Sequence, residues 1–142
     1  MVKIKIKKLH SDAKVPSYAH EGDAGMDVYS NEDLIIGAGK RVLVSTGIST
    51  EFPVGYVALV WDKSGIAVKG GVTKMAGVID AGYRGEWKIA LLNTSEEDYE
   101  IKKGEKIAQV LLQKVESPEI EIVEDVENSS RGDGGFGSTG LH

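Results

Sequence analysis

Apolar and polar residues alternate over short stretches of this chain, and they seldom recur every three or four positions. Residues 2–7 alternate with a period of two, which is the pattern of a half-buried β-strand. Other runs rich in Val, Ile and Leu are separated by breakers that contain glycine or proline. Strands at this spacing predict an all-β sandwich or barrel. The predicted strands cover residues 2–7, 34–36, 41–50, 56–61, 72–75, 88–92, 107–115 and 120–123.

One short helix is predicted over residues 64–69. It would run from Ser64, a candidate N-cap, to the pair Gly70 and Gly71, which could end it. A helix of this length is not stable alone. The free N–H groups and the dipole at its start would favour a phosphate next to Lys63. A plain serine cap explains the same residues, so this segment alone leaves both interpretations open.

The ten residues 77–86 read Gly-Val-Ile-Asp-Ala-Gly-Tyr-Arg-Gly-Glu and lie between two predicted strands. They predict a β-hairpin with a functional tip, because glycines allow sharp turns that present backbone N–H and C=O groups to a small planar ligand. Asp80 is then a candidate general base beside that ligand. An ordinary turn would also contain Asp and Gly for conformational reasons.

Composition restricts the function further. The 142 residues fit one domain, and the absence of cysteine excludes disulfides and thiolate metal sites. A net charge of −5 argues against a broad nucleic-acid surface. No stretch resembles a signal peptide or reaches the roughly 18 apolar residues of a membrane span, so we expect a cytoplasmic protein without membrane contact. His10, His20 and His142 lack metal-ligand spacing, and we expect them at the surface.

The C-terminal part differs in composition from the rest. The acidic residues 116–127 predict a solvated strand and linker, and residues 128–142 carry five glycines without periodicity. We therefore expect a β-domain over residues 1–127 and a flexible glycine-rich lid over residues 128–142. Arg131 could clamp a phosphate and Phe136 could stack on a base, which is unusual content for a linker.

Five ordered segments carry a resemblance to a known family. They are Ala-Gly-Met-Asp-Val at 24–28, Asp-Lys-Ser-Gly-Ile-Ala at 62–67, the hairpin at 77–86, Lys-Gly-Glu-Lys-Ile-Ala-Gln at 103–109 and Arg-Gly-Asp-Gly-Gly-Phe-Gly-Ser-Thr-Gly at 131–140. In this order they resemble the trimeric dUTPase family. The resemblance implies an all-β fold, a distorted jelly-roll or β-clip-like barrel with one short helix and a flexible C-terminal arm. It also implies a homotrimer with active sites at subunit interfaces.

The resemblance implies hydrolysis of dUTP to dUMP and pyrophosphate, with Mg²⁺ held on the triphosphate through water and no direct metal ligand from the protein. Such an enzyme lowers dUTP, which prevents uracil incorporation into DNA, and it supplies dUMP for dTMP synthesis. Asp80 would deprotonate the water that attacks the α-phosphorus, and Asp27 would support the metal-water shell or the sugar side. Substrate binding would fall to Lys63, Ser64, Gly65, Lys74, Gly77, Val78, Ile79, Tyr83, Lys88, Gln109, Arg131, Phe136, Gly137 and Ser138.

Several departures from the family pattern leave alternatives open. Asp62 and Lys63 stand where Pro-Arg is usual; lysine keeps the charge but loses the bidentate fork. Gly82 stands where a second Asp is common in dUTPases. Related dCTP deaminases have the sequence Asp-Pro-Gly at this point. Those enzymes need a catalytic Glu that would fall at Ala90, which cannot transfer protons. A deaminase, a bifunctional relative and a non-catalytic nucleotide-binding regulator on the same fold are therefore the alternatives.

Overall fold

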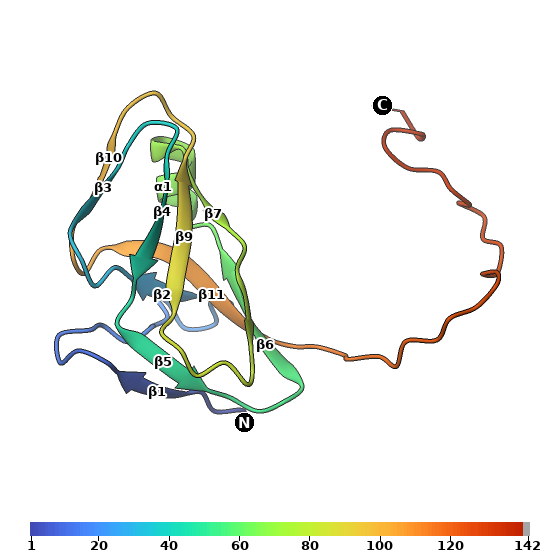
Figure 1. The fold of residues 1–142 in the computed structure, drawn as a ribbon, viewed down its shortest axis with the longest axis horizontal. Coiled ribbons are helices and arrows are strands. Elements are labelled where there is room, and N and C mark those ends of the chain that lie inside the picture. Colours follow the sequence, from blue (N-terminus) through green and yellow to red (C-terminus); the bar gives the residue numbers. More distant parts are fainter. Residues whose placement is uncertain (141–142) are drawn as a thin grey trace.

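The protein, described here over residues 1–140 of a computed structural model, consists of short β-strands with one helix in that range (Figure 1). This confirms the predicted all-β class. The elements in chain order are β1 Lys5–Lys8, β2 Met26–Tyr29, β3 Leu34–Ile36, β4 Arg41–Ser45, β5 Ile48–Glu51, β6 Tyr56–Trp61, α1 Ser64–Gly70, β7 Val72–Met75, β8 Val78–Asp80, β9 Lys88–Asn93, β10 Tyr99–Ile101 and β11 Lys106–Lys114.

The strands form four antiparallel sheets around one apolar core. The largest has the order β2-β11-β6-β8, and a second has the order β4-β9-β7; β1 pairs with β5 and β10 with β3. Core-facing positions alternate with outward ones along β9, where Ile89 and Leu91 are buried. Trp87, directly before this strand, is fully buried and lies in the core cluster.

The register of β11 brings distant segments of the chain together. Gln109 lies opposite Asp27 of β2 on one side and opposite Trp61 of β6 on the other. Three segments that are far apart in the sequence therefore meet at one point of the four-stranded sheet. This is the main way in which the fold assembles a site.

The predicted strand over residues 41–50 is interrupted in the structure. Thr46 and Gly47 separate β4 from β5, and the two strands belong to different sheets. Gly47 has φ +72, and a Cβ there would lie 2.9 Å from Nδ2 of Asn31, so glycine is required. The N–H of Thr46 donates to the carbonyl of Trp87, which fixes the break.

The helix is confirmed, but its cap differs from the prediction. Lys63 occupies the N-cap position in extended conformation and makes no side-chain cap bond, so the helix begins at Ser64 itself. At the other end Gly71 adopts φ 69, and its N–H donates to the carbonyls of Ala67 and Ile66. The predicted glycine stop is therefore confirmed.

The predicted strand over residues 120–123 is wrong for the single chain. The last strand ends at Lys114, and residues 115–140 run away from the body without forming strands (Figure 1). A strand needs a hydrogen-bonding partner, and none is available along this path. Ile120 and Ile122 are 89% and 95% exposed. The boundary at residues 127/128 between domain and lid stays a prediction.

Two further predictions concern the histidines and membrane contact. His10 and His20 are exposed as predicted, whereas His142 lies outside the described residues. The helix found in residues 1–140 is not long and apolar enough to cross a membrane.

Candidate active site

A first cavity of 360 Å³ lies at the predicted hairpin. Strands β7 and β9 pair antiparallel from Val72 opposite Asn93 to Met75 opposite Ala90, so the predicted hairpin stem is confirmed. The connection between them is more elaborate than a turn, because β8 within it pairs with β6 of the other sheet. The cavity is lined by Leu43, Val60, Met75, Ala76, Gly77, Val78, Ile79, Asp80, Tyr83, Glu86, Trp87, Lys88, Ile89 and Ala90.

The backbone at the entry to β8 is held in an unusual conformation. Ala76 has φ 58 and Gly77 has φ 122, and the second value strongly favours glycine. A Cβ at Gly77 would lie 3.1 Å from both the Cβ and the carbonyl oxygen of Val60. The carbonyl of Gly77 accepts the N–H of Val60 at 2.8 Å. The main chain that lines the cavity is therefore close to β6 and fixed to it.

The tip of the hairpin braces Tyr83. Its N–H donates to the carbonyl of Asp80 at 3.1 Å, and its hydroxyl donates to the carbonyl of Glu86 at 2.9 Å. The Glu86 carboxylate in turn accepts hydrogen bonds from the Ser45 hydroxyl and, at 3.4 Å, from the N–H of Gly47. The ring of Tyr83 thus has a defined place at the cavity although it is half-exposed.

Asp80 closes β8 and is exposed at the cavity. Within residues 1–140 its carboxylate takes part in no ion pair and accepts no side-chain or backbone hydrogen bond. A carboxylate without a protein partner remains available to accept a proton from a bound water. This geometry is consistent with the predicted general base.

A second cavity of 450 Å³ is built from charged and polar residues. Asp27 is only 3% exposed, and its Oδ1 lies 2.5 Å from Lys63 Nζ and its Oδ2 2.9 Å from Lys106 Nζ. Burial would raise the pKa of this carboxyl, but the two lysines outweigh burial and hold the pKa below its ordinary value. The carboxylate is therefore ionised and neutralised in place. The cavity is lined by Ala19, Asp23, Ala24, Gly25, Asp27, Trp61, Asp62, Lys63, Gln109 and Leu111.

The side chain of Gln109 spans this cavity. Its Nε2 donates to the carbonyl of Asp62 at 2.9 Å. Its Oε1 lies where a side chain at Gly25 would stand, because a Cβ there would come within 2.4 Å of that oxygen. Gly25 is therefore needed for close packing, and the Ala-Gly-Met-Asp segment and Gln109 belong to one structural unit.

Lys74 lies between the two cavities. Its Nζ lies 5.5 Å from the centre of the Trp61 ring, which lines the second cavity. The same Nζ donates to the carbonyl of Ala76, which lines the first cavity, at 3.2 Å. Lys88 lines the first cavity from β9, whereas Ser64 and Gly65 are exposed at the start of α1 and line neither.

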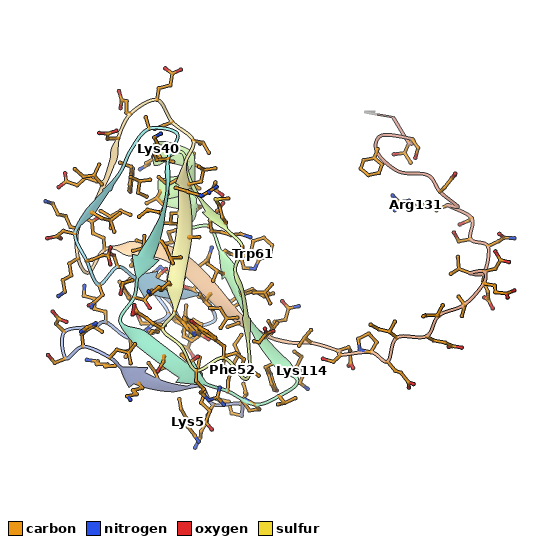
Figure 2. All side chains as sticks on the ribbon, viewed as in Figure 1. Lys5, Lys40, Phe52, Trp61, Lys114 and Arg131 are labelled. Atoms are coloured by element: carbon orange, nitrogen blue, oxygen red, sulfur yellow. The ribbon has the colours of Figure 1, made fainter. Side chains whose placement is uncertain are left out.

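The predicted arm residues lie apart from both cavities. Arg131 is held only locally, by its Nε donating to the carbonyl of Gly134 at 2.7 Å, and Figure 2 shows it well away from the body that carries Trp61. Phe136 is fully exposed and has φ 51, and Gly137 and Ser138 are exposed as well. One chain therefore does not bring the arm to the other predicted site residues.

Sequence reasoning missed the interactions of three residues in or beside these cavities. Lys106 pairs with Asp27, Glu86 braces the hairpin tip, and the Asp62 side chain points to β7. Lys106 and Glu86 lay inside the quoted segments, but their type and spacing gave no sign of their partners. Over residues 1–140 there is no group of three His, Asp or Glu that could hold a metal ion, and the Asp27 carboxylate is already paired with two ammonium groups.

Comparisons with known proteins agree with this architecture. The dUTPase family model matches residues 11–140. The deoxyuridine 5'-triphosphate nucleotidohydrolase of Clostridium tetani is 50% identical over 139 residues, which cover 96% of each chain. Staphylococcus bacteriophage 80alpha dUTPase, solved with dUPNHPP, is 30% identical with a TM-score of 0.93, covering 98% of this chain and 99% of that one.

A third comparison concerns a metal. A mutant dUTPase from phage phi11 of S. aureus, whose structure describes the coordination of a structural Mg(II) ion, is 26% identical with a TM-score of 0.82. It covers 89% of this chain and 99% of that chain. These neighbours confirm the predicted jelly-roll architecture. With a family match over residues 11–140 and half of its residues shared with a bacterial relative, this chain belongs to the dUTPase family.

Proposed function

We propose that this protein hydrolyses Mg²⁺-bound dUTP to dUMP and pyrophosphate. The proposal depends mainly on the first cavity, where a free carboxylate at Asp80, a braced Tyr83 and a fixed stretch of backbone line one space in a chain of the dUTPase family. The solved phage relative carries dUPNHPP, in which an NH group replaces the oxygen between the first two phosphorus atoms.

The base and sugar would be read at the hairpin. Backbone groups of Gly77, Val78 and Ile79 line the first cavity and would face a planar base edge, and the tight hairpin would exclude a 5-methyl group. Tyr83, held by the carbonyl of Glu86, packs against the deoxyribose and excludes a 2′-hydroxyl. Selectivity for dUTP over dTTP and UTP then follows from shape.

Asp80 would act as the general base. It orients a water molecule and takes one of its protons while the water oxygen bonds to the α-phosphorus. The bond from the α-phosphorus to the bridging oxygen breaks, and pyrophosphate leaves. A positioned base of this kind contributes ~10²–10⁴-fold to the rate. The absence of any partner for Asp80 in residues 1–140 supports this role, because the carboxylate needs no rearrangement to accept the proton.

The phosphates would be held by the second group of residues. Lys63, kept in place by the buried Asp27, supplies positive charge, and Gln109 offers an amide to phosphate oxygens or an ordered water. Mg²⁺ enters as part of the substrate and neutralises the triphosphate; the pairing of Asp27 with two lysines makes it a poor direct ligand. The remaining contacts are assigned to Ser64, Gly65, Lys74 and Lys88.

The arm would complete the site. Arg131 clamps the γ-phosphate, Phe136 stacks on the uracil, and Gly137 and Ser138 contact the phosphate end. The glycines of residues 128–142 allow the arm to close and exclude water, which strengthens the charge interactions.

We also propose that the active form is a homotrimer with sites between subunits. In one chain most proposed site residues divide among two cavities and an arm that contacts neither, and Ser64 and Gly65 line neither cavity. Leu43 and Val78, which line the first cavity, are 56% and 69% exposed, and Ile122 and Val126 of the acidic segment before the arm are 95% and 85% exposed. Exposed apolar residues of this size favour burial against another copy. Light scattering coupled to size-exclusion chromatography tests the assembly, and a monomeric active enzyme would exclude it.

The activity is tested by separate incubations with dUTP, dCTP, dTTP and UTP in the presence of Mg²⁺. Pyrophosphate, ammonia and the nucleotide product are measured in each. We expect pyrophosphate and dUMP from dUTP only. Ammonia from dCTP would instead support the deaminase alternative, against which stands the presence of Ala90 on the wall of the first cavity. Nucleotide binding without turnover would support the regulator alternative.

A further inference from the structure

Asp62 connects three elements that surround the two cavities, through both its carboxylate and its backbone. It lies between the end of β6 and the start of α1. Its Oδ2 accepts the hydroxyl of Thr73 at 2.6 Å and its Oδ1 accepts the N–H of Lys74 at 2.6 Å, so the carboxylate is bound to β7. Its backbone carbonyl accepts Nε2 of Gln109 from β11 at 2.9 Å.

These bonds join the walls of the two cavities. Strand β7 ends at Met75 and is followed by Ala76, and both residues line the first cavity. Asp62 and Gln109 line the second cavity, and the next residue, Lys63, is the ion-pair partner of Asp27 there. The Asp62 carboxylate therefore adds a side-chain link between the hairpin stem and the charged cavity, beside the backbone pairing of β8 with β6.

The chemistry of the bonded groups suits this task. An ionised carboxylate only accepts hydrogen bonds, and here each oxygen meets a donor, one O–H and one N–H, on adjacent residues of one strand. Charge-assisted bonds of this kind are shorter and stronger than neutral ones. Both oxygens are turned to β7, so the negative charge at this position is engaged inside the protein and is not presented to a triphosphate.

We propose that Asp62 is a positioning residue for dUTP hydrolysis. It fixes the hairpin that reads the base relative to the residues that hold the phosphates, and it contacts neither the substrate nor the reacting atoms. This inference rests on the proposed function. Small displacements of substrate-positioning groups reduce rates strongly, by up to about 10²-fold for a shift of about 1 Å.

The test compares three variants with a matched control. Asp62→Ala removes both bonds to β7, and Thr73→Val removes one of them while leaving the carboxylate. Asp62→Asn keeps an oxygen that accepts the Lys74 N–H. The control is Asp33→Ala, because Oδ1 of Asp33 also accepts a backbone N–H, that of Lys103 at 2.7 Å, and Asp33 lines neither cavity.

For each protein we would measure kcat and KM for dUTP, the melting temperature, and the affinities for dUPNHPP and dUMP. For Asp62→Ala we expect kcat for dUTP to fall about 10–100-fold. Affinity for dUPNHPP should weaken, while dUMP, which reaches fewer of the phosphate-binding residues, should bind within about twofold of wild type. Thr73→Val should show a smaller loss of the same kind, and Asp62→Asn should recover most of the activity. Asp33→Ala should lower the melting temperature without changing the kinetic constants.

Three outcomes would overturn the proposal. The first is unchanged kinetics in both Asp62→Ala and Thr73→Val, which would make the bonds purely structural. The second is an equal loss of dUMP and dUPNHPP affinity, which would indicate local damage to the base pocket. The third is an Asp62→Asn variant as poor as Asp62→Ala. Lack of turnover in the wild-type protein would instead contradict the proposed function, and the comparison of dUPNHPP with dUMP would still decide the role of Asp62.

Discussion

The site residues of the body and those of the arm are held very differently. In the body, Asp27 is buried between two lysines, Tyr83 is hydrogen-bonded at the hairpin tip, and Gln109 is fixed against Gly25. In the arm, Arg131 contacts only its own turn and Phe136 contacts no part of the core. Body positions are therefore expected to combine activity with stability, whereas arm positions should affect activity alone.

Asp80→Asn should reduce activity more than any other substitution. Asp80 is also the exception among the body residues, because its replacement should affect activity and not stability. Asp80 has no protein partner in residues 1–140, so its replacement should leave the melting temperature unchanged. We expect kcat to fall by ~10²–10⁴-fold, the contribution of a positioned base, with dUPNHPP binding retained. Steady-state kinetics and calorimetry measure the two quantities. An unchanged kcat would remove Asp80 from the mechanism.

Truncation after Ser130 tests the difference between body and arm most directly. Removal of residues 131–142 deletes the proposed clamp and stacking group, and none of the described residues 131–140 belongs to the core. We expect the melting temperature and the oligomeric state to stay as in the full chain, while kcat/KM for dUTP falls by about 10²-fold or more. Full turnover in the truncated protein would contradict the lid assignment. Phe136→Ala in the full chain should reproduce part of the loss.

Asp27→Asn should reduce stability by about 1–3 kcal/mol, because it leaves two ammonium groups without their buried partner. Urea unfolding measures the change. Asp12→Asn is the matched control, since Asp12 pairs with Lys103 at the exposed surface and its loss should change stability little. Equal changes in unfolding free energy for the two substitutions would mean that the buried ion pairs of Asp27 contribute no more stability than an exposed pair.

The ion pairs of Asp27 also predict how stability depends on pH. The pKa of Asp27 is lower in the folded protein than the ordinary value of 3.8, because Lys63 and Lys106 outweigh the opposing effect of burial. The resulting stability is fully present above the unfolded pKa of about 3.9, and it is lost as pH falls through the lower folded pKa. Between neutral pH and about pH 3, the wild type should therefore lose more unfolding free energy than Asp27→Asn. If the unfolding free energies of the two proteins changed in parallel with pH, this would contradict the lowered pKa of Asp27.

Gly85→Ala should have the smallest effect on stability and a specific effect on selectivity. A Cβ at Gly85 would lie 2.3 Å from Oη of Tyr83, so the half-exposed ring must move away. We expect discrimination between dUTP and UTP to fall by about tenfold, equivalent to about 1.4 kcal/mol, with little change in the melting temperature. The ratio of kcat/KM values measures it. Unchanged discrimination would remove Tyr83 from sugar recognition.

The sequence predicted the parts of the fold that local chemistry determines. The hairpin stem and the glycine stop at Gly71 were predicted correctly, because turn residues and period-two patterns act over a few residues. The break at Gly47 was not predicted, since it depends on Asn31 and on the carbonyl of Trp87, both distant in the sequence. The strand over residues 120–123 had the right pattern but finds no partner strand within residues 1–140.

The same limit applies to the candidate site. The types and order of the site residues indicated nucleotide chemistry, but not which of them contact one another. Lys63 looked like a plain phosphate ligand, and the structure pairs it with Asp27. Asp62 stood out in the sequence only as a departure from the family pattern, and in the structure its carboxylate is turned to Thr73 and Lys74. Side-chain direction at these positions is set by strand register, which no local pattern encodes.

The central place of β11 has a consequence for how the chain folds. The strand Lys106–Lys114 is hydrogen-bonded to β2 and to β6, which precede it by about eighty and about fifty residues. The four-stranded sheet, and with it the second cavity, cannot close until nearly the whole chain has left the ribosome. Chains dominated by such distant pairings fold in milliseconds to seconds, far more slowly than helical bundles. Because β11 is paired on both sides, its backbone amides should also be among the last to exchange with solvent in the native protein.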